Sequence, residues 1–385
     1  MKKLPALFQV PLLLLLTGNG MADDFRVLPS VSLREEYNDN IFFNEDTGQD
    51  DFITTASAGL ALRERTERLN ADLVTRFDGL AYADHTELND IEEYYKGSLG
   101  YQLNPFVKLS ADAGYSVDSR PDRDIDVTGL VFTNDVRRRQ SYSGAAEFQA
   151  TEKTALFTSY SYQDDQFEIE DTDEFTGQNV MLGLTRSLAL IKPTALRFYG
   201  HYSHYDFFSS KVDNYSLTGG FSRQVTEKLS FILDAGPRYT EGSEKGTTNT
   251  SYDSGLGGRF SLTYAEELTS ADLALFHEIS GSGGRDGATE RTGLPLAVKR
   301  RTAARSSVRL AIDSFLNKAD RETAFVSNLD ELTTSVSPSL HYEFSPEIFC
   351  EAAYRYTLVD NREVEHERHR NLVFVKLTYQ YPVVE

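Results

Sequence analysis

The sequence predicts an all-β protein: a transmembrane antiparallel up-and-down β-barrel of about 18 strands, with short periplasmic turns and long extracellular loops. Three observations support this fold class. Apolar and polar side chains alternate along many short segments, short turns alternate with long polar connections, and the chain opens with an export signal. Beyond that signal, no run approaches the roughly 18 consecutive apolar residues of a membrane-spanning helix.

The N-terminus has the pattern of a cleaved secretory signal peptide. Two lysines precede an apolar run that ends near Leu16, and small residues follow at Gly20 and Ala22. Cleavage after Ala22 gives 1–22 as the signal peptide and 23–385 as a single barrel domain. Loss of the two lysines moves the formal charge from −20 to −22. The exported protein is therefore acidic and is not expected to bind nucleic acid, which requires clustered Lys and Arg.

Alternation of side chains is clearest around the polar turn 226–228. Leu229, Phe231 and Leu233 follow this turn at every second position, and Asp234 belongs to the opposite set. Successive side chains of a β-strand point to opposite faces. The pattern therefore predicts a hairpin with one apolar and one polar face.

Comparable connections recur along the whole chain. Short turns are expected at 66–68, 104–106, 151–153, 226–228, 265–267 and 345–347, with weaker examples near 189–192 and 300–302. Longer polar connections are expected roughly at 41–50, 83–90, 120–137, 164–175, 207–211, 241–250, 281–289, 315–331 and 359–369. Eight short turns and nine long connections give eighteen antiparallel strands, with both chain ends on the periplasmic side.

The expected strand length suits a membrane. Strands of about 12 residues that rise about 3.3 Å per residue and tilt by about 40° reach about 30 Å, which exceeds an apolar band of about 25 Å. An open sheet edge in hydrocarbon would leave backbone groups unpaired, so the sheet must close. A secreted β-sandwich or solenoid is the alternative, but its short and long connections need not alternate strictly.

On the barrel hypothesis the apolar face meets lipid and the polar face lines the lumen. Val107, Leu109 and Ala111 exemplify the lipid-facing set, and tyrosines near strand ends suit the aromatic girdles of the two interfaces. Cys350 falls on the lipid-facing side as a small apolar residue. As the only cysteine, it cannot form an internal disulfide.

The lumen face is expected to carry charges of both signs. The candidate cations of a substrate path are Arg76, Lys96, Lys108, Arg197, Arg238, Arg259, Arg305, Arg309 and Arg355. Charges four apart on one strand, such as Asp234 and Arg238, lie about 13 Å apart, so ion pairs are expected between neighbouring strands. A structural charge network and a path for a charged solute are both compatible with this pattern.

No catalytic, metal or cofactor site is predicted. His201 and His204 are three apart, which places them on opposite faces of a strand. The glycine-rich segment 281–287 lacks the Gly-Lys-Ser/Thr ending of a phosphate loop and is expected to be a flexible loop. The acidic run 164–174 lacks the spacing of a Ca²⁺ loop and is expected to be a solvated surface, with cation binding as the alternative.

The segment EYNDNIFFNEDTGQDDFITTASAGLAL at 36–62 resembles the opening hairpin of the β-barrel porin 2 family. The matching residues are Tyr37, Asn38, Asp39, Asn40, Ile41 and Phe42, followed by Asp51, Phe52, Ile53 and Thr54. The closing strand NLVFVKLTYQY at 371–381 extends the resemblance over most of the chain. Its terminal aromatics are similar to the signal read by the barrel assembly machinery, although four more residues follow.

Members of this family are often encoded in exopolysaccharide biosynthesis loci. The resemblance therefore implies a porin of the Gram-negative outer membrane that exports a polysaccharide of the capsule or biofilm matrix. It implies as partners the polysaccharide, a periplasmic polysaccharide export protein, outer-membrane lipid and lipopolysaccharide, and no cofactor or enzymatic activity. A general diffusion porin for small solutes and a barrel hydrolase of envelope lipids are the alternatives.

Overall fold

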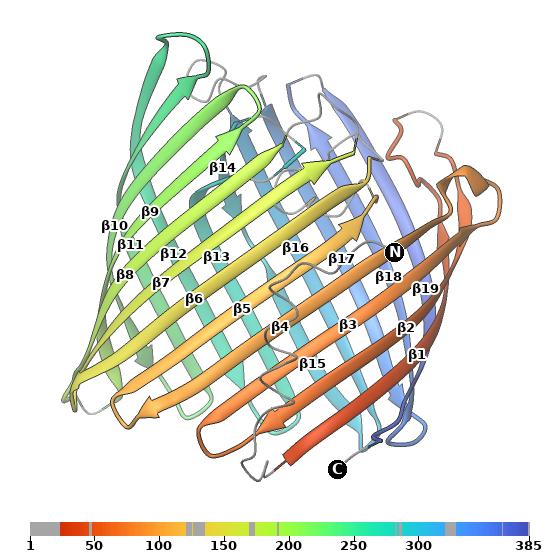
Figure 1. Cartoon of the computed structure of the whole chain (residues 1–385), viewed down its shortest axis with the longest axis horizontal. Helices are drawn as coiled ribbons and strands as arrows, with labels where there is room; N and C mark the ends of the chain where they lie inside the picture. Colours follow the sequence, from red (N-terminus) through yellow and green to blue (C-terminus); the bar gives the residue numbers. More distant parts are fainter. Residues whose placement is uncertain are drawn as a thin grey trace.

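The structure of the 385-residue chain is a computed structural model that describes residues 24–45, 48–120, 125, 135–168, 174–190, 192–281, 283–284, 287–319, 329–363 and 365–383. The predicted signal peptide 1–22 lies outside the described residues. The strands form one antiparallel sheet that closes on itself, because β1 pairs with both β2 and β19 (Figure 1). A tilted, closed all-β barrel confirms the predicted fold class.

The strand bounds locate every later residue. They are β1 Asp24–Asn38, β2 Asp51–Arg65, β3 Leu69–Tyr82, β4 Asp90–Asn104, β5 Val107–Asp118, β6 Arg137–Thr151, β7 Thr154–Phe167, β8 Phe175–Leu188, β9 Thr194–Phe207, β10 Ser210–Gln224, β11 Leu229–Glu244, β12 Thr250–Ala265, β13 Thr269–Ser280, β14 Thr289–Gly293, β15 Leu296–Ala303, β16 Ser306–Ala319, β17 Leu329–Glu343, β18 Ile348–Asn361 and β19 His366–Gln380. One short 3₁₀ turn, η1 at Thr86–Leu88, precedes β4. Within the described residues, no helix is long and apolar enough to span a membrane.

Strands β14 and β15 share one place in the barrel wall. Both lie between β13 and β16, and they are separated only by Leu294 and Pro295. Proline cannot donate a backbone hydrogen bond, so it commonly stands where a ladder is interrupted. The nineteen strand segments therefore make eighteen wall positions, as predicted.

The short turns and both described chain ends lie at one end of the barrel, the short-turn end. In the turns 66–68 and 226–228, the Thr66 and Thr226 hydroxyls accept hydrogen bonds from the N–H groups of Leu69 and Leu229 at 2.9 and 3.0 Å. This shared side-chain cap explains why the same polar turn recurs in the sequence. The turn expected at 300–302 is wrong, since those residues belong to β15 and the chain reverses after Ala303.

At the opposite end of the barrel, the long-loop end, several strands are longer than expected. Strands β7, β11, β16 and β18 continue into residues that were expected to be loop. The connection predicted at 207–211 is reduced to Phe208 and Ser209 between β9 and β10. Strands here run 14–16 residues, longer than the 12 assumed, because the wall continues beyond the thickness of a bilayer.

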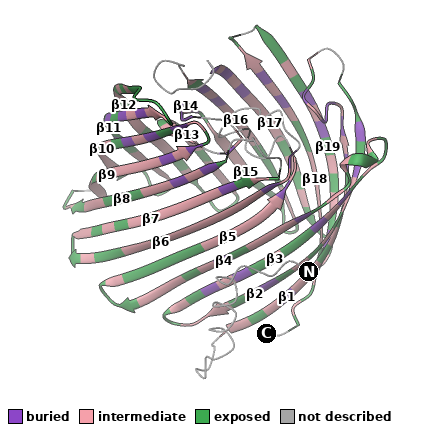
Figure 2. Cartoon of the chain, turned by 45° about the horizontal axis from the view of Figure 1, so that its top comes forward, coloured by how far each residue is buried: buried purple, intermediate pink, exposed green. Residues whose placement is uncertain are grey.

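Exposed and less exposed residues alternate along the strands (Figure 2). Leu109, Leu233 and Tyr239 are exposed on the outer face, and residues paired directly across an antiparallel ladder share a face. Cys350 pairs with Tyr342 and Leu377, both exposed apolar residues, so its predicted lipid-facing position is confirmed. The outer surface is apolar, as in barrels of outer membranes.

Candidate functional site

A cavity of about 740 Å³ occupies the lumen beside strands β6 to β13. Its charged lining residues are Glu147, Arg197, Asp234, Arg238, Arg259 and Glu278. Its aromatic and imidazole lining residues are Phe157, Tyr199, His201, Tyr205, Phe276 and His277. The cavity therefore combines guanidinium, carboxylate and hydroxyl groups with a few apolar rings.

Strands β9, β11 and β12 bring alternating charges together in this cavity. Arg197 of β9 donates its Nε–H to Asp234 Oδ1 of β11 at 3.1 Å, and its guanidinium lies 5.0 Å from the centre of the Tyr199 ring. Asp234 is directly opposite Arg259 of β12. Arg259 donates its Nε–H to Ser261 at 3.1 Å. Arg197 is thus paired with Asp234, Arg259 faces the same aspartate across the ladder, and the three arginines of the cavity are matched in number by its three carboxylates.

Arg238 is tied more tightly than the other two arginines. One of its Nη atoms donates to Asp253 Oδ2 at 2.7 Å and to Thr240 Oγ1 at 3.3 Å, and the other Nη contacts the carboxylate of Glu290. Its side chain is only 4% exposed. The predicted pairing between strands is confirmed here, and Arg238 is a structural anchor more than a free ligand for solutes.

Glu290 belongs to an inward hairpin, which we define as residues 276–293 around the turn between β13 and β14. Ile279 and Ala288 of this hairpin pack with Phe175, Tyr205, Phe207 and Val212 from the lumen side of β8, β9 and β10. The Tyr205 hydroxyl also lies 3.5 Å from the carbonyl oxygen of Ile279. The hairpin thus lies inside the barrel, against the inner face of β8 to β11. The described glycines of 281–287 are packed parts of it, and the prediction of a merely flexible loop is wrong for them.

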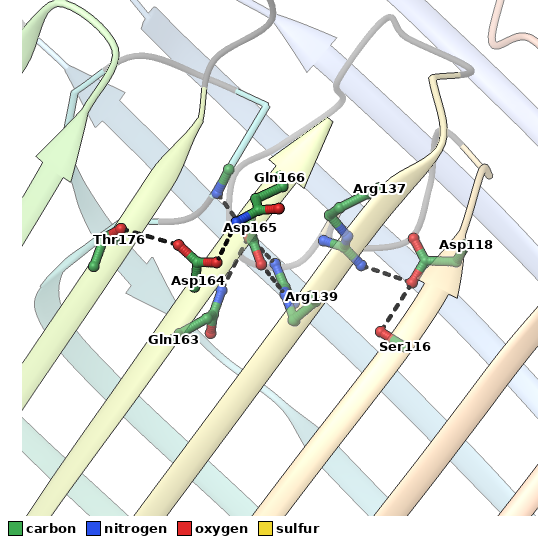
Figure 3. Close-up of polar contacts among 10 residues, drawn as sticks. Ser116, Asp118, Arg137, Arg139, Gln163, Asp164, Asp165, Gln166 and Thr176 are labelled. Atoms are coloured by element: carbon green, nitrogen blue, oxygen red, sulfur yellow. Dashed lines mark hydrogen bonds and ion pairs between the residues drawn. The ribbon is translucent and has the colours of Figure 1, made fainter. Parts of the chain in front are cut away.

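Asp165 holds the tip of the inward hairpin (Figure 3). Its carboxylate accepts two hydrogen bonds of 2.6 Å from Arg139 and one of 3.1 Å from Gln163. The backbone N–H of Gly283 adds another at 3.1 Å. Asp165 is 0% exposed, so the expectation that 164–174 is a solvated surface is wrong at this residue. Residues 169–173 lie outside the described part of the chain.

A second inward segment, residues 39–45 directly after β1, lies at the same end of the barrel. Phe43 is fully buried against Val359 and Ile125, and the Arg370 guanidinium lies 4.2 Å from the centre of its ring. Phe43 has a φ of 55°, a left-handed conformation that is uncommon for a bulky residue. Arg120, just beyond β5, donates to Glu36 of β1 at 2.8 Å. Both inward segments narrow the lumen at the long-loop end.

The family-motif residues form the framework of this second segment. Asp39 accepts two hydrogen bonds of 2.7 Å from the backbone and side chain of Asn371, which ties β1 to the last strand. The Asn40 side chain donates to Asn44 O at 2.8 Å and to His369 O at 3.0 Å.

Other motif residues support the neighbouring loop and the outer surface. The Asp51 carboxylate accepts N–H groups of Ala83, Asp84 and His85 at 2.9–3.1 Å. The Tyr37 and Phe52 rings contact each other on the outer surface in a tilted arrangement, with ring centres 5.0 Å apart. Asn38 accepts the N–H of Asn40 at 3.1 Å, and Ile41 and Ile53 are buried. These contacts give the motif a structural role.

The predicted path cations do not form one group. Arg197, Arg238 and Arg259 line the cavity, whereas Arg76, Lys96, Lys108, Arg309 and Arg355 lie on the lumen face of β3, β4, β5, β16 and β18. Arg76 pairs with Asp78 at 2.9 Å and Arg355 with Ser337 at 3.2 Å. Arg305 is misplaced by the prediction. It lies in the turn after β15, where it donates to Phe344 O at 3.0 Å.

The two histidines of β9 lie on opposite faces, as predicted. His201 lines the cavity, and His204 contacts Asp213 Oδ1 at 2.9 Å on the outer side. Among the described residues, no group of three or more His, Cys, Asp or Glu side chains is placed to hold a metal ion.

Sequence reasoning missed Glu290, Asp165 and Arg139 as residues that shape the lumen. Glu290 follows the same alternation as every wall strand, so its pattern does not distinguish an inward hairpin from a wall hairpin. The available signal was Pro295, which stands where a continuous ladder would need an N–H donor.

No protein-family model matches the chain, and no curated protein matches it. Among solved structures, the chain is similar to OpdK of Pseudomonas aeruginosa with vanillate, at 10% identity over 94% of this chain and 100% of that chain, with a TM-score of 0.47. It is also similar to OccAB4 of Acinetobacter baumannii, at 11% identity, 94% and 100% coverage and a TM-score of 0.48. The siderophore receptor PirA of Pseudomonas aeruginosa matches at 10% identity, 92% and 80% coverage and a TM-score of 0.45. At these values the similarity does not inform on substrate, and function has to be inferred from the lumen.

Proposed function

We propose that this barrel exports a secreted polysaccharide across the outer membrane of a Gram-negative cell, by transport and not by catalysis. One observation carries the proposal: the lumen holds a polar cavity of about 740 Å³, and inward segments narrow it at the long-loop end. A hydroxyl-rich polymer can exchange hydrogen bonds with such a wall. The export function also follows from the family resemblance of the opening hairpin.

The charged side chains of the cavity are already paired, which suits the passage of a polymer. Arg197 and Arg238 already have carboxylate partners, so a sugar hydroxyl would compete with an existing ion pair at each contact. Conduction requires sites that bind strongly enough to admit the solute and weakly enough to release it. The rings of Tyr199 and Phe157 add apolar faces between the polar contacts. The wall therefore offers many weak and successive contacts.

The narrowed mouth argues against the main alternative, a general diffusion porin. Wide barrels of that class keep a permanent aqueous channel. Here the inward hairpin is fixed by Asp165 and Glu290, and Phe43 is buried in the other inward segment. We infer that export needs the hairpin to move. A periplasmic polysaccharide export protein docked on the short turns would be placed to couple that movement to polymer delivery.

Gene deletion with complementation tests the function. Deletion is expected to abolish surface polysaccharide while polymer synthesis inside the cell continues, and the unaltered gene should restore it. Unchanged surface polysaccharide in the deletion strain would exclude export as the function.

A disulfide lock tests the movement separately. A Cβ added at Gly283 would lie 2.7 Å from the Asp165 Cβ, so a small shift gives the roughly 3.5–4.5 Å of a disulfide. The variant Asp165→Cys, Gly283→Cys and Cys350→Ser should fail to export when oxidised and recover when reduced. Its control is Cys350→Ser alone. Equal export by the oxidised and reduced forms would contradict the movement and leave the export function standing.

A further inference from the structure

Two cations lie directly opposite each other on the lumen face of the wall. Lys299 of β15 is the ladder partner of Arg309 of β16. Side chains paired in this way share a face and have Cβ atoms about 5 Å apart, so Lys299 lies on the lumen face with Arg309. Arg301 is two residues further along β15 and therefore belongs to the same face. We name Lys299, Arg301 and Arg309 the entrance cluster; all three are exposed to the water of the lumen.

The positive charge of the entrance cluster is not neutralised by the wall around it. In the part of the chain that the structure describes, none of the three side chains forms an ion pair or a hydrogen bond. The carboxylates of the adjoining strands have other partners: Asp272 of β13 accepts a hydrogen bond from Thr263 at 3.0 Å, and Glu343 of β17 contacts His341 at 3.5 Å. Like charges directly opposite each other destabilise a ladder, which favours an anion between them.

Serine hydroxyls flank the two opposed cations. Ser270 of β13 is the ladder partner of Lys299, and Ser339 of β17 is the ladder partner of Arg309. One row across four strands therefore reads serine, lysine, arginine and serine on the lumen face. A hydroxyl can donate one hydrogen bond and accept others, so the row offers sugar hydroxyls a partner on each side of the two charges.

The entrance cluster lies at the short-turn end of the lumen. Arg301 is two residues from Ala303, the last residue of β15, and β16 starts at Ser306. None of the three cations belongs to the described lining of the 740 Å³ cavity. Toward the long-loop end, the next row of the ladder is Ala297 opposite Ala311, whose methyl groups leave space for a sugar ring. A polymer that enters from the short-turn end therefore meets unneutralised cations before it reaches the cavity.

We propose that the entrance cluster binds the anionic sugar residues of an acidic polysaccharide as the polymer enters the barrel. This inference rests on the proposed export function and adds the class of the exported polymer. The Arg309 guanidinium can hold an oxyanion through two parallel hydrogen bonds, and the Lys299 ammonium adds a point charge from the opposite strand. A surface of one charge sign raises the local concentration of an oppositely charged ligand. A neutral polymer gains no such attraction.

Fluorescence anisotropy with labelled oligosaccharides tests the site. The full mature chain in a neutral detergent is titrated into tetragalacturonate, which carries carboxylates, into sulfated maltotetraose, and into neutral maltotetraose. At least one anionic probe should bind about tenfold more tightly than neutral maltotetraose, and its affinity should fall as salt rises, because salt screens exposed charges. The order of the two anionic probes identifies the oxyanion that the cluster prefers. Equal binding of all three probes would overturn the proposal.

Paired substitutions separate the role of charge from that of structure. Lys299→Gln with Arg309→Gln should weaken binding of the preferred anionic probe about tenfold and leave neutral maltotetraose unchanged, because charge-assisted contacts are lost. The exchange Lys299→Arg with Arg309→Lys keeps both charges and should keep most of the affinity. Arg65→Gln is the matched control, since Arg65 lies at the same end but is paired with Asp72 at 2.6 Å. Unchanged affinity in the double Gln variant, or an equal loss in Arg65→Gln, would remove the cluster from the site.

The binding measurement and the deletion experiment can fail independently. If the deletion strain keeps its surface polysaccharide, export is excluded, while a preference of the purified barrel for anionic probes still supports the site. If deletion abolishes surface polysaccharide and the three probes bind equally, export stands and only the acidic class of the polymer is refuted.

Discussion

The two ends of the lumen use the same kinds of ion pair in opposite environments. At the long-loop end, Arg137 and Asp118 are 3.0 Å apart with side chains that are 4% and 8% exposed. At the short-turn end, Arg65 and Asp72 are 2.6 Å apart with side chains that are 38% and 29% exposed. The geometry is similar, and the difference is the access of water. We conclude that the first pair ties neighbouring wall strands without access of water, whereas the second pair is open to solvent.

Desolvation explains why this difference matters. Removal of one partner of a buried pair leaves an uncompensated charge and costs about 3–5 kcal/mol. Exposed pairs contribute about 0–1 kcal/mol, because water and salt screen them. If this explanation is right, removal of an ion pair should lower the free energy of unfolding much more at the long-loop end than at the short-turn end.

The largest effect is expected from Asp165→Ala. This change leaves the Arg139 guanidinium without its two hydrogen bonds and frees Gly283 at the hairpin tip. We expect a loss of about 3–5 kcal/mol in the free energy of unfolding, measured by denaturant titration in vesicles. Frequent opening should also appear in single-channel recordings.

Asp164→Ala is the matched control for this variant. Asp164 is the preceding residue on the opposite face, where it accepts hydrogen bonds from Gln166 and Thr176 (Figure 3). It should have little effect on stability or on conductance. Similar losses in both variants would show that the buried environment of Asp165 is not what matters.

A smaller but more specific effect is expected from Glu290→Gln. Arg238 keeps Asp253, so the cost should be about 1.5–3 kcal/mol for one charged hydrogen bond. The channel should open more often, because the inward hairpin loses its tie to β11. Asp253→Asn removes the other partner of the same arginine without touching the hairpin. It should reduce stability comparably while the channel stays closed, and opening in both variants would refute the role of Glu290 as a tie.

Arg259→Gln should modestly change the selectivity of the open lumen between cations and anions. The cavity loses one of its three arginines while its three carboxylates remain, so the reversal potential in a salt gradient should shift toward cations by several millivolts. The shift should shrink as salt rises, because the Debye length falls from about 30 Å at 0.01 M to about 3 Å at 1 M. Arg305→Gln, in a turn outside the lumen, should leave the reversal potential unchanged. A shift of the same size there would show that the effect is not specific to the cavity.

The sequence was sufficient for features that depend on local patterns. Alternation placed Leu233 outside and Asp234 inside, and the polar turns after Arg65 and Gln224 appear where the pattern predicted them. Both depend on neighbours within a few residues. The Thr66 and Thr226 caps act over three residues, which is why they are visible in the sequence.

The inward segments depend on contacts that no local pattern encodes. Gly283 and Asp165 are 118 residues apart, and Arg120 and Glu36 are 84 apart. The alternation of Ile279 and Glu290 is the same whether the hairpin stays in the wall or folds against the inner face of the wall. The sequence assigns the three cavity arginines to the lumen, but it does not place them in one cavity. Strand order alone does not say where a closed barrel narrows.

The smallest effect is expected from Lys228→Ala in a short turn. Lys228 forms an ion pair with Glu266 of the next turn, and this hydrogen bond lowers the pKa of the Glu266 carboxyl. A lowered carboxyl pKa stabilises the folded state above the unfolded pKa, and the effect disappears as pH falls through the folded value. Both side chains are solvent-exposed, so we expect no measurable change in Tm at pH 7 or at pH 3. A Tm that falls at pH 7 and recovers at pH 3 would mean that this end of the barrel is less hydrated than the structure indicates, and the contrast between the two ends would then fail.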